Sequence, residues 1–500
     1  MMGAPGVPGA IALPAAFAAG ALTVLSYDPF GLWPVAIGTF ALYQFLLFAR
    51  PDLGVRLGLA FGLGLFGFGV NWVHVSMHDY GGMGLPEALL LTGLFVIYLA
   101  CYPMLHGWLV GRLERRPLAA RVLLSPPLWV LLEWTRARAF TGFPWLAAGY
   151  SQTDSPLAGF APLGGVFLVG FFLLLTAALL AGLPRLRRNA ARAWALVGLA
   201  TVWGVGGLSW HHAWTEGSGA PVRVSLLQGN IAQDRKWRPE MRGRTIARYL
   251  QLTRHEWHDA GWRARLVVWP ESAIPAFEDE VEASVLRPLQ EEAAAAGSAL
   301  LIGIPVLDRD DWRYYNAVAA IDGQGIRHYY KHHLVPFGEY LPLRTWFGDL
   351  LEVLPLPVAD FSAGPARPTL LKVAGVVVRA SVCYEVAFGD EIRKGLPKAG
   401  LLVNVSNDAW FGDSIAAPQH LQMARMRALE TGRWLVRATN TGITAAVDEK
   451  GRIVARAPRD EVAVVRAEVV TMQGATPYVV LGDGLVLACC GLFLPFAVRR

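Results

Sequence analysis

The sequence predicts a multi-span α-helical membrane domain joined to an exported α/β domain, and three observations support this prediction. First, 54% of the 500 residues are hydrophobic and 17% are charged, whereas a soluble domain carries about 25% charged residues. Second, the apolar surplus lies before residue 211 and near the C-terminus. Third, strand-like and helical patterns alternate from Pro221 onward, which is typical of layered α/β or α+β domains.

Eight apolar segments have lengths near the roughly 20 residues that cross a hydrocarbon core as a helix. The fifth is the weakest candidate because it contains Arg121, Pro126, Pro127 and Glu133, and it could instead be interfacial or re-entrant. Residues 1–10 contain no Lys or Arg, so the first segment does not match a secretory signal peptide. The segments are 9–25, 31–49, 57–76, 86–110, 118–134, 159–183, 193–210 and 477–497.

Loop arginines predict the orientation of these segments. Arg136 and Arg138 lie on one predicted side, and the loop at 77–85 on that side has no Lys or Arg. The loops and tail on the other predicted side carry many more arginines: Arg50, Arg56, Arg112, Arg115, Arg116, Arg121, Arg185, Arg187, Arg188, Arg192, Arg499 and Arg500. The positive-inside rule therefore places both termini in the cytoplasm and the intervening domain in the periplasm or its equivalent. The predicted domains are a membrane domain of seven helices at 1–210, an exported domain at 220–472, and a last helix and tail at 477–500.

Charge and cysteine content exclude two classes of protein. The net charge of +6 is explained largely by cytoplasmic loop arginines near anionic headgroups, and no nucleic-acid motif is present, so no nucleic-acid partner is expected. Cys101, Cys489 and Cys490 fall in predicted membrane helices, which leaves Cys383 alone in the exported domain. This pattern is not a disulfide framework, and a lone thiol there is either reactive or a buried structural cysteine.

The exported region is predicted to contain eight strands and three helices. The strands are expected at 222–227, 265–269, 299–304, 317–321, 376–382, 401–405, 435–438 and 443–447. The helices are expected at 239–258, 279–296 and 415–432.

A thiol, a carboxylate and an amine each follow a strand-like segment. Cys383 follows the strand predicted at 376–382, Glu271 follows that at 265–269, and Lys331 lies in a stretch that also contains Glu339. These residue types indicate covalent acyl chemistry on a cysteine, because a thiol of pKa about 8.5 needs a base or a nearby cation. Taken singly, Glu271 would more often cap a helix and Lys331 would more often be a solvated loop lysine; the coincidence of all three motifs favours catalysis instead.

Around these residues the sequence resembles the nitrilase superfamily, whose members use Glu, Lys and Cys on an αββα sandwich. Other motifs resemble the apolipoprotein N-acyltransferase family, nearly from end to end: 142–145, 149–152, 227–231, 269–272, 331–340, 404–412 and 437–442. The resemblance implies the last step of bacterial lipoprotein maturation at the inner (cytoplasmic) membrane. A phospholipid acyl donor would form a cysteine thioester, and a diacylglyceryl-apolipoprotein amine would then accept the acyl chain.

The resemblance also assigns roles to the catalytic residues. Cys383 is expected to be the nucleophile, Glu271 the general base and Lys331 the stabiliser of the oxyanion. Glu339 is expected to support the lysine and Glu385 the cysteine, although both could be ordinary loop carboxylates.

Aromatic residues near these motifs are candidates for substrate contacts. Tyr384 is expected to shape the site. Trp237 is expected to contact lipid or to lie at the membrane interface. Two loops, 343–363 and 408–418, are candidates for a mobile lid, although their aromatic residues could simply pack the domain. These residues are Trp346, Phe347, Trp410 and Phe411.

No metal, no cofactor and no obligatory partner subunit are expected. His332 and His333 are adjacent and so cannot easily face one ion, and His420 is expected to be structural. Two other functions stay open. One is a membrane-tethered amidase, which would use the same three residues with water as acceptor. The other is a transporter or receptor, which would need more ionisable residues within the spans than Glu87 and Glu133 near their ends.

Overall fold

The computed structural model describes residues 7–186, 188–259, 261–341 and 360–493. These residues form two compact units. Of the described residues, 7–74, 85–186, 188–213 and 480–493 belong to the helical unit, and 75–84, 214–259, 261–341 and 360–479 belong to the sheet unit. The chain thus leaves the helical unit for ten residues between two of its helices.

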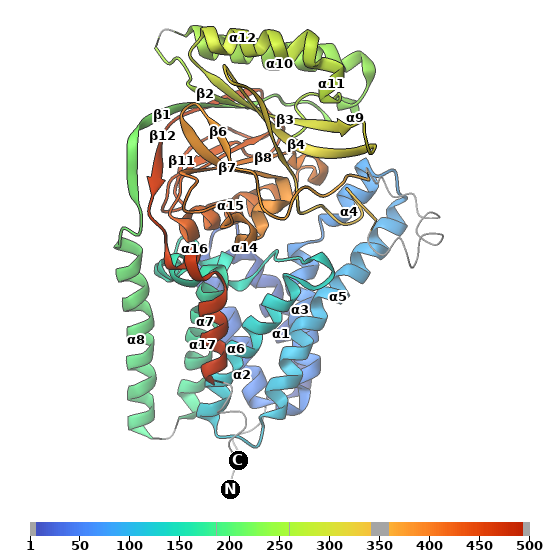
Figure 1. Ribbon diagram of the computed structural model, residues 1–500. Helices are drawn as coiled ribbons and strands as arrows, with labels where there is room; N and C mark the ends of the chain where they lie inside the picture. Colours follow the sequence, from blue (N-terminus) through green and yellow to red (C-terminus); the bar gives the residue numbers. More distant parts are fainter. Residues whose placement is uncertain (1–6, 187, 260, 342–359, 494–500) are drawn as a thin grey trace. The chain divides into compact units, whose positions relative to one another are not determined.

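The helical unit is built from long apolar helices (Figure 1). Among the described residues, five helices are long and apolar enough to cross a membrane, and two apolar helices, α2 and α17, are shorter. The five candidate spans are Gly9–Ser26, Pro51–Gly69, Leu85–Arg112, Pro156–Arg185 and Asn189–His211. The helices of this unit are α1 (Gly9–Thr23), α2 (Trp33–Ala49), α3 (Gly54–Gly69), α5 (Leu85–Arg112), α6 (Leu118–Arg136), α7 (Ala161–Gly182), α8 (Asn189–His211) and α17 (Gly484–Phe493).

Three predicted apolar segments differ from the helices observed. Helix α3 ends at Gly69, seven residues before the predicted end, and the chain then enters the sheet unit. Helix α6 forms but is not among the five candidate spans, since it carries Arg121, Glu133 and Arg136. The C-terminal segment is divided into α16 (Pro477–Leu481) and α17, with Gly482 at a φ of 56° between them.

Glycines allow the helices of this unit to pack closely. A Cβ added at Gly58 of α3 would lie 2.1 Å from the Pro103 carbonyl oxygen of α5, and one at Gly20 of α1 would lie 2.0 Å from the Phe61 carbonyl oxygen of α3. Small residues at such crossings favour van der Waals packing where lipid offers no hydrophobic driving force.

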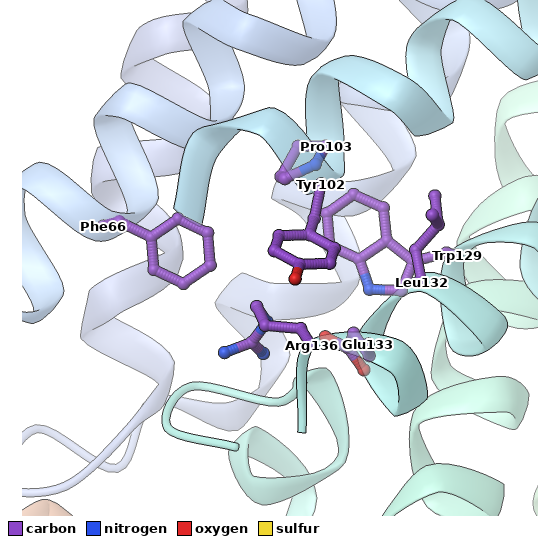
Figure 2. Close-up of a pocket in the computed structure, with 7 residues that line it drawn as sticks. All are labelled: Phe66, Tyr102, Pro103, Trp129, Leu132, Glu133 and Arg136. Atoms are coloured by element: carbon purple, nitrogen blue, oxygen red, sulfur yellow. The ribbon is translucent and has the colours of Figure 1, made fainter. Parts of the chain in front are cut away.

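Helix α6 buries two ionisable residues one turn apart, Glu133 and Arg136. They line a small cavity together with Phe66, Tyr102 and Trp129 (Figure 2). The Arg136 Nη1 donates to the carbonyl oxygens of Phe143 and Trp145 at 2.6 and 2.8 Å. The Glu133 Oε1 accepts a hydrogen bond from the Ala148 backbone N–H at 2.9 Å. These charges therefore pair with backbone groups of the irregular segment 143–148.

Within the described residues, the sheet unit contains two six-stranded sheets, ordered β12-β1-β2-β3-β4-β5 and β11-β10-β9-β8-β7-β6. In the first, β1, β2 and β3 are parallel; in the second, β7, β8 and β9 are parallel. The strands are β1 (Glu216–Gln228), β2 (Leu266–Val268), β3 (Ala299–Asp308), β4 (Arg313–Asp322), β5 (Gly325–Tyr330), β6 (Leu371–Val373), β7 (Val376–Val382), β8 (Leu401–Ser406), β9 (Leu435–Thr439), β10 (Ala445–Val447), β11 (Ile453–Arg456) and β12 (Ala463–Gln473).

The two sheets face each other and helices cover their outer faces (Figure 1). Side chains of both sheets form one buried core that includes Val224, Leu301, Val378 and Val403. Helices α10 (Pro239–His258) and α12 (Arg287–Ala295) pack on the first sheet, and α15 (Ala416–Thr431) packs on the second. The layered α/β architecture predicted from sequence is therefore confirmed as a helix-covered pair of sheets.

The sequence prediction missed four strands: β5, β6, β11 and β12. All four lie at sheet edges: β12 and β5 are the two edge strands of the first sheet, and β11 and β6 are those of the second. Strand β5 pairs antiparallel with β4 and leads to Lys331, and β12 pairs along the length of β1. Edge strands bury fewer residues, so their apolar periodicity is weak; β11 has no fully buried residue. The predicted eighth strand at 443–447 is shorter in the structure, Ala445–Val447.

Candidate active site

The ends of three strands bring the predicted residues together. Glu271 follows β2, Lys331 follows β5 directly and Cys383 follows β7 directly. Glu271 is 8% exposed and Lys331 is 1% exposed, while Cys383 is partly buried. Glu271 and Lys331 both interact electrostatically with the Cys383 thiol. Strands β2 and β5 belong to the first sheet and β7 to the second, and the carboxyl ends of strands are where α/β sheets commonly place their sites.

A buried hydrogen-bond network holds the two carboxylates around the lysine. The Lys331 Nζ pairs with Glu339 at 2.7 Å. The Asn316 Nδ2, on β4, donates to Glu271 at 2.7 Å and to Glu339 at 3.0 Å. The Val335 backbone N–H donates to the second Glu339 oxygen at 2.8 Å. Glu339 therefore lies at the lysine, where the sequence prediction expected it, and Asn316 is a member of the site that the sequence prediction missed.

The electrostatics of the site favour a protonated thiol at rest. Burial raises the pKa of Cys383 to about 12, with a further increase from Glu271 that Lys331 opposes. Burial also raises the pKa of Glu271, while Lys331 lowers it. For Lys331, burial lowers the pKa, but Glu339 and Glu271 outweigh this effect and keep the lysine cationic. A neutral thiol beside a carboxylate needs proton transfer as it attacks, which is the role of a general base.

Backbone geometry places Glu271 close to β3. The next residue, Ser272, has a φ of 46°, and a Cβ added at Gly303 of β3 would lie 2.6 Å from the Glu271 Cα. Only glycine fits at this close approach. The buried side chain of Lys236 donates a hydrogen bond from Nζ to the Glu271 carbonyl oxygen at 3.1 Å. Burial lowers the pKa of Lys236 to about 8, and Glu271 opposes this shift.

Glu385 joins the loop after Lys331 to the turn at Cys383. Its carboxylate accepts hydrogen bonds from the backbone N–H groups of Val382, His332 and His333 at 2.7, 2.8 and 3.1 Å, and from the Tyr329 hydroxyl at 2.9 Å. This arrangement suits a positioning role. Tyr384 packs edge-on against Phe388, with ring centroids 5.0 Å apart.

A second buried cluster joins Cys383 to Asp408 and His420, two residues outside the predicted set. Ligand atoms of Cys383, Asp408 and His420 lie within 4.8 Å of one another. Two Arg437 hydrogen bonds reach the Asp408 carboxylate at 2.8 and 2.9 Å. Burial alone would raise the pKa of Asp408, but Arg437 and His420 hold it well below its usual range.

The donor set of this cluster does not suit a metal ion. Both His420 ring nitrogens are engaged, one with Asp408 and one with the Cys383 carbonyl. The Arg437 guanidinium already neutralises the carboxylate at the position that a cation would need.

Two sequence motifs join the two sheets near the site. The Asn440 side chain, just after β9, accepts from the Ile231 N–H at 3.0 Å and donates to the Ile231 carbonyl at 2.7 Å. The Asn230 N–H donates to the Asn440 carbonyl at 3.0 Å. These bonds join the motif at 227–231, which ends β1 of the first sheet, to the motif at 437–442, which ends β9 of the second.

The predicted lipid-contact and lid residues are only partly described. Trp237 is 52% exposed. Trp410 and Phe411 are partly buried in a 3₁₀ turn, Asp408–Phe411. Within the sheet unit, the Ser76 hydroxyl donates to the Trp410 carbonyl at 2.7 Å and the Tyr80 ring packs edge-on against Trp410. The other predicted lid loop, with Trp346 and Phe347, lies mostly outside the described residues.

Two family models match this chain. The apolipoprotein N-acyltransferase N-terminal domain matches residues 19–179, and the carbon-nitrogen hydrolase model matches residues 223–477. An apolipoprotein N-acyltransferase of Methylococcus capsulatus is 46% identical, with 97% of this chain and 96% of the relative covered. The chain belongs to the apolipoprotein N-acyltransferase family. This family catalyses the N-acylation step of lipoprotein maturation, so the chain is an acyltransferase.

One more relative and one solved structure also match this chain. The apolipoprotein N-acyltransferase of Nitrosomonas europaea is 44% identical, covering 96% of this chain and 95% of the relative. Among solved structures, Saccharomyces cerevisiae Nit3, a member of branch 10 of the nitrilase superfamily, matches with a TM-score of 0.39 and 18% identity, covering 51% of this chain and 93% of that chain.

Proposed function

We propose that this protein transfers a fatty acyl chain from a membrane phospholipid to the α-amine of an S-diacylglyceryl-cysteine at an apolipoprotein N-terminus, through a thioester on Cys383. The observation that carries the proposal is the convergence of a partly buried thiol, a buried carboxylate and a buried lysine at the ends of three strands. Covalent acyl transfer needs a nucleophile, a base and an oxyanion stabiliser, and these residues supply all three.

In the first half-reaction, the Cys383 sulfur attacks the ester carbonyl carbon of the phospholipid while Glu271 accepts the thiol proton. The oxyanion that forms is stabilised by the Lys331 ammonium, which Glu339 holds in place. As the ester C–O bond breaks, Glu271 returns the proton to the departing lysophospholipid oxygen. The raised pKa of Glu271 suits both tasks, since it brings the carboxyl closer to the operating pH.

In the second half-reaction, the acceptor amine attacks the thioester carbon and Glu271 takes one of its protons. The C–S bond breaks, and the Cys383 sulfur leaves and regains a proton. Asn316 contacts both carboxylates, so it keeps Glu271 and Glu339 in fixed positions through the two steps.

We infer that the helical unit crosses a bacterial inner membrane eight times, with both termini cytoplasmic and the catalytic region periplasmic. The five long and two shorter apolar helices and the arginine-rich loops support this topology. A membrane site suits lipid substrates, because extracting an acyl chain into water costs about 0.8 kcal/mol per CH₂ group. A reporter fused after Arg188 should read cytoplasmic and one after Gly217 exported; the opposite readings would reverse the topology.

The decisive experiment is intact-mass analysis of the purified protein with phospholipid in detergent. We expect an acyl adduct that maps to Cys383 and disappears when a diacylglyceryl-cysteine peptide is added, with acyl peptide as product. An adduct that is released only to water would instead identify an amidase-like hydrolase. No adduct, in a preparation whose parent membranes are active, would refute the thioester.

A further inference from the structure

The backbone of Cys383 adopts an unfavourable conformation that its surroundings must impose. Its φ is 50°, in the left-handed region that non-glycine residues rarely occupy. Such strain persists only where neighbouring groups over-determine it. On the side before the cysteine, Glu385 holds the Val382 N–H at 2.7 Å. On the side after it, the Cys383 carbonyl accepts hydrogen bonds from His420 at 3.2 Å and from Asn404 at 3.4 Å.

His420 is the better placed of these two donors. It is 1% exposed in α15, and its Nε2 faces the Cys383 carbonyl, which can only accept, so this nitrogen carries the proton. Its Nδ1 lies 2.9 Å from both Arg437 Nη2 and Asp408 Oδ1. Burial and then Arg437 lower the pKa of His420, and the Asp408 carboxylate opposes this shift. The neutral imidazole that carries its proton on Nε2 and the imidazolium can both donate to the Cys383 carbonyl.

The hydrogen-bond partners of His420 are themselves fixed. Asp408 pairs with Arg437 and accepts the Ser406 hydroxyl at 2.9 Å. Arg437 also hydrogen-bonds the Asn404 side chain. These groups come from β8, β9 and the turn that follows β8, so the ring is held by three segments of the second sheet.

We propose that His420 is a positioning residue: its Nε2–H holds the Cys383 carbonyl and thereby keeps the thiol directed toward Glu271 and Lys331. The inference rests on the acyl transfer proposed above. It differs from a Cys-His-Asp triad, in which the imidazole would take the thiol proton. Here the nitrogen nearest the cysteine already donates to its carbonyl, and the carboxylate available as base is Glu271.

A pair of substitutions separates the two roles. H420Q can present an amide N–H near the position of Nε2, whereas the shorter side chain of H420N reaches only the position of Nδ1. Neither amide can act as a base near neutral pH. H258Q, an exposed histidine on α10, is the matched control.

The measured quantities are the rate and KM of Cys383 acyl-adduct formation with phospholipid, and the rate of Cys383 alkylation by iodoacetamide. For H420N we expect adduct formation to slow about 100-fold with KM nearly unchanged, since a displaced nucleophile loses rate rather than binding. Alkylation should slow in parallel. H420Q should form the adduct at a rate within about tenfold of the wild-type rate. The control H258Q should react at the wild-type rate.

Several results would overturn the inference. If H420N forms the adduct at the wild-type rate, the hydrogen bond from residue 420 to the Cys383 carbonyl is unnecessary. If H420Q is as slow as H420N, the imidazole acts as a base and not as a positioning donor. If H420N does not accumulate in membranes, H420L is measured in its stead. If neither variant folds while H420Q does, the hydrogen bond is required for folding alone and the positioning role is wrong. If wild type forms no adduct, the proposed acyl transfer fails, while the alkylation rates still test His420.

Discussion

The two units bury ionisable side chains in different ways. In the helical unit, the hydrogen bonds that Glu133 and Arg136 make to the segment 143–148 go to backbone groups, and the two side chains also interact with each other. In the sheet unit, Glu271, Lys331 and Glu339 interact with one another and with Asn316. Backbone partners cannot exchange protons, so they fix a structure. Titratable partners perturb each other's pKa, which is how active sites are poised for proton transfer.

The same distinction applies inside the sheet unit. Glu385 accepts three backbone N–H groups and a tyrosine hydroxyl, and so resembles the residues of the helical unit. Glu271 and Glu385 both flank the nucleophile, yet only Glu271 is expected to carry protons. Substitutions that affect chemistry and not folding, or folding and not chemistry, test this distinction.

Cys383 offers the largest expected effect. C383A should lower acyl transfer by at least roughly 10⁴-fold, because the nucleophile forms the covalent intermediate. Membrane accumulation should be unchanged. C101A, which removes an exposed thiol of α5, is the control and should keep full activity. If C383A retains transfer activity, Cys383 is not the nucleophile and the sheet-unit cluster is not the catalytic site.

Glu385 should chiefly affect stability. E385Q is expected to destabilise the protein by about 1–3 kcal/mol, since the buried N–H and hydroxyl donors lose a charged acceptor. E468Q, at an exposed carboxylate paired with Arg223, should cost about 0.5 kcal/mol. Thermal unfolding in detergent measures both. If E385Q unfolds like wild type but loses activity, Glu385 belongs with the chemical residues.

Arg136 tests the helical unit. R136M is expected to destabilise this unit by about 3 kcal/mol, because the carbonyls of Phe143 and Trp145 lose a charged donor. The iodoacetamide reactivity of Cys383 should stay the same at temperatures where the protein is folded. R115M, an exposed arginine after α5, is the matched control. Altered Cys383 reactivity in folded R136M would contradict a purely structural role.

Lys236 should give the smallest effect, a shift in pH dependence. Because burial raises the pKa of Glu271 above its ordinary value of 4.5, activity should rise with pH as Glu271 loses its proton. Lys236 lowers that pKa, so K236M should raise it and move the acidic limb of kcat/KM to higher pH, by about one unit or less. A limb that moves to lower pH, or stays in place, would show that Lys236 does not act on Glu271.

Much of the secondary structure of the catalytic region could be predicted, because it depends on apolar patterns among neighbouring residues. The alternation of apolar runs predicted β7, β8, α10 and α15 close to their observed bounds, since buried parallel strands and packed helices require continuous apolar faces. Cys383 and Glu271 were predicted because each has a distinct chemistry and follows a predicted strand. Lys331 was predicted from the motif at 331–340, since β5 itself was not predicted.

Other members of the site had weak signals or none. Asn316 is a single polar residue at the start of an apolar run, and Lys236 lies in a charged stretch, 233–236, that is typical of a solvated surface. His420 was expected to be an ordinary structural histidine, because nothing in its helix indicates that the ring faces Cys383. Each of these residues acquires its role only from a partner distant in the sequence.

Local patterns in the sequence were enough to predict the apolar helices, the layered α/β domain, the family and the three reactive residue types, because periodicity, composition and local motifs are properties of neighbouring residues. Which charged groups meet depends instead on the folded arrangement of distant segments. That arrangement placed Asn316 between two carboxylates, Lys236 beneath Glu271, and His420 against the carbonyl of a strained cysteine. Hydrogen bonds and pKa shifts depend on distances of a few ångströms between segments far apart in the chain, and those distances exist only once both sheets have folded.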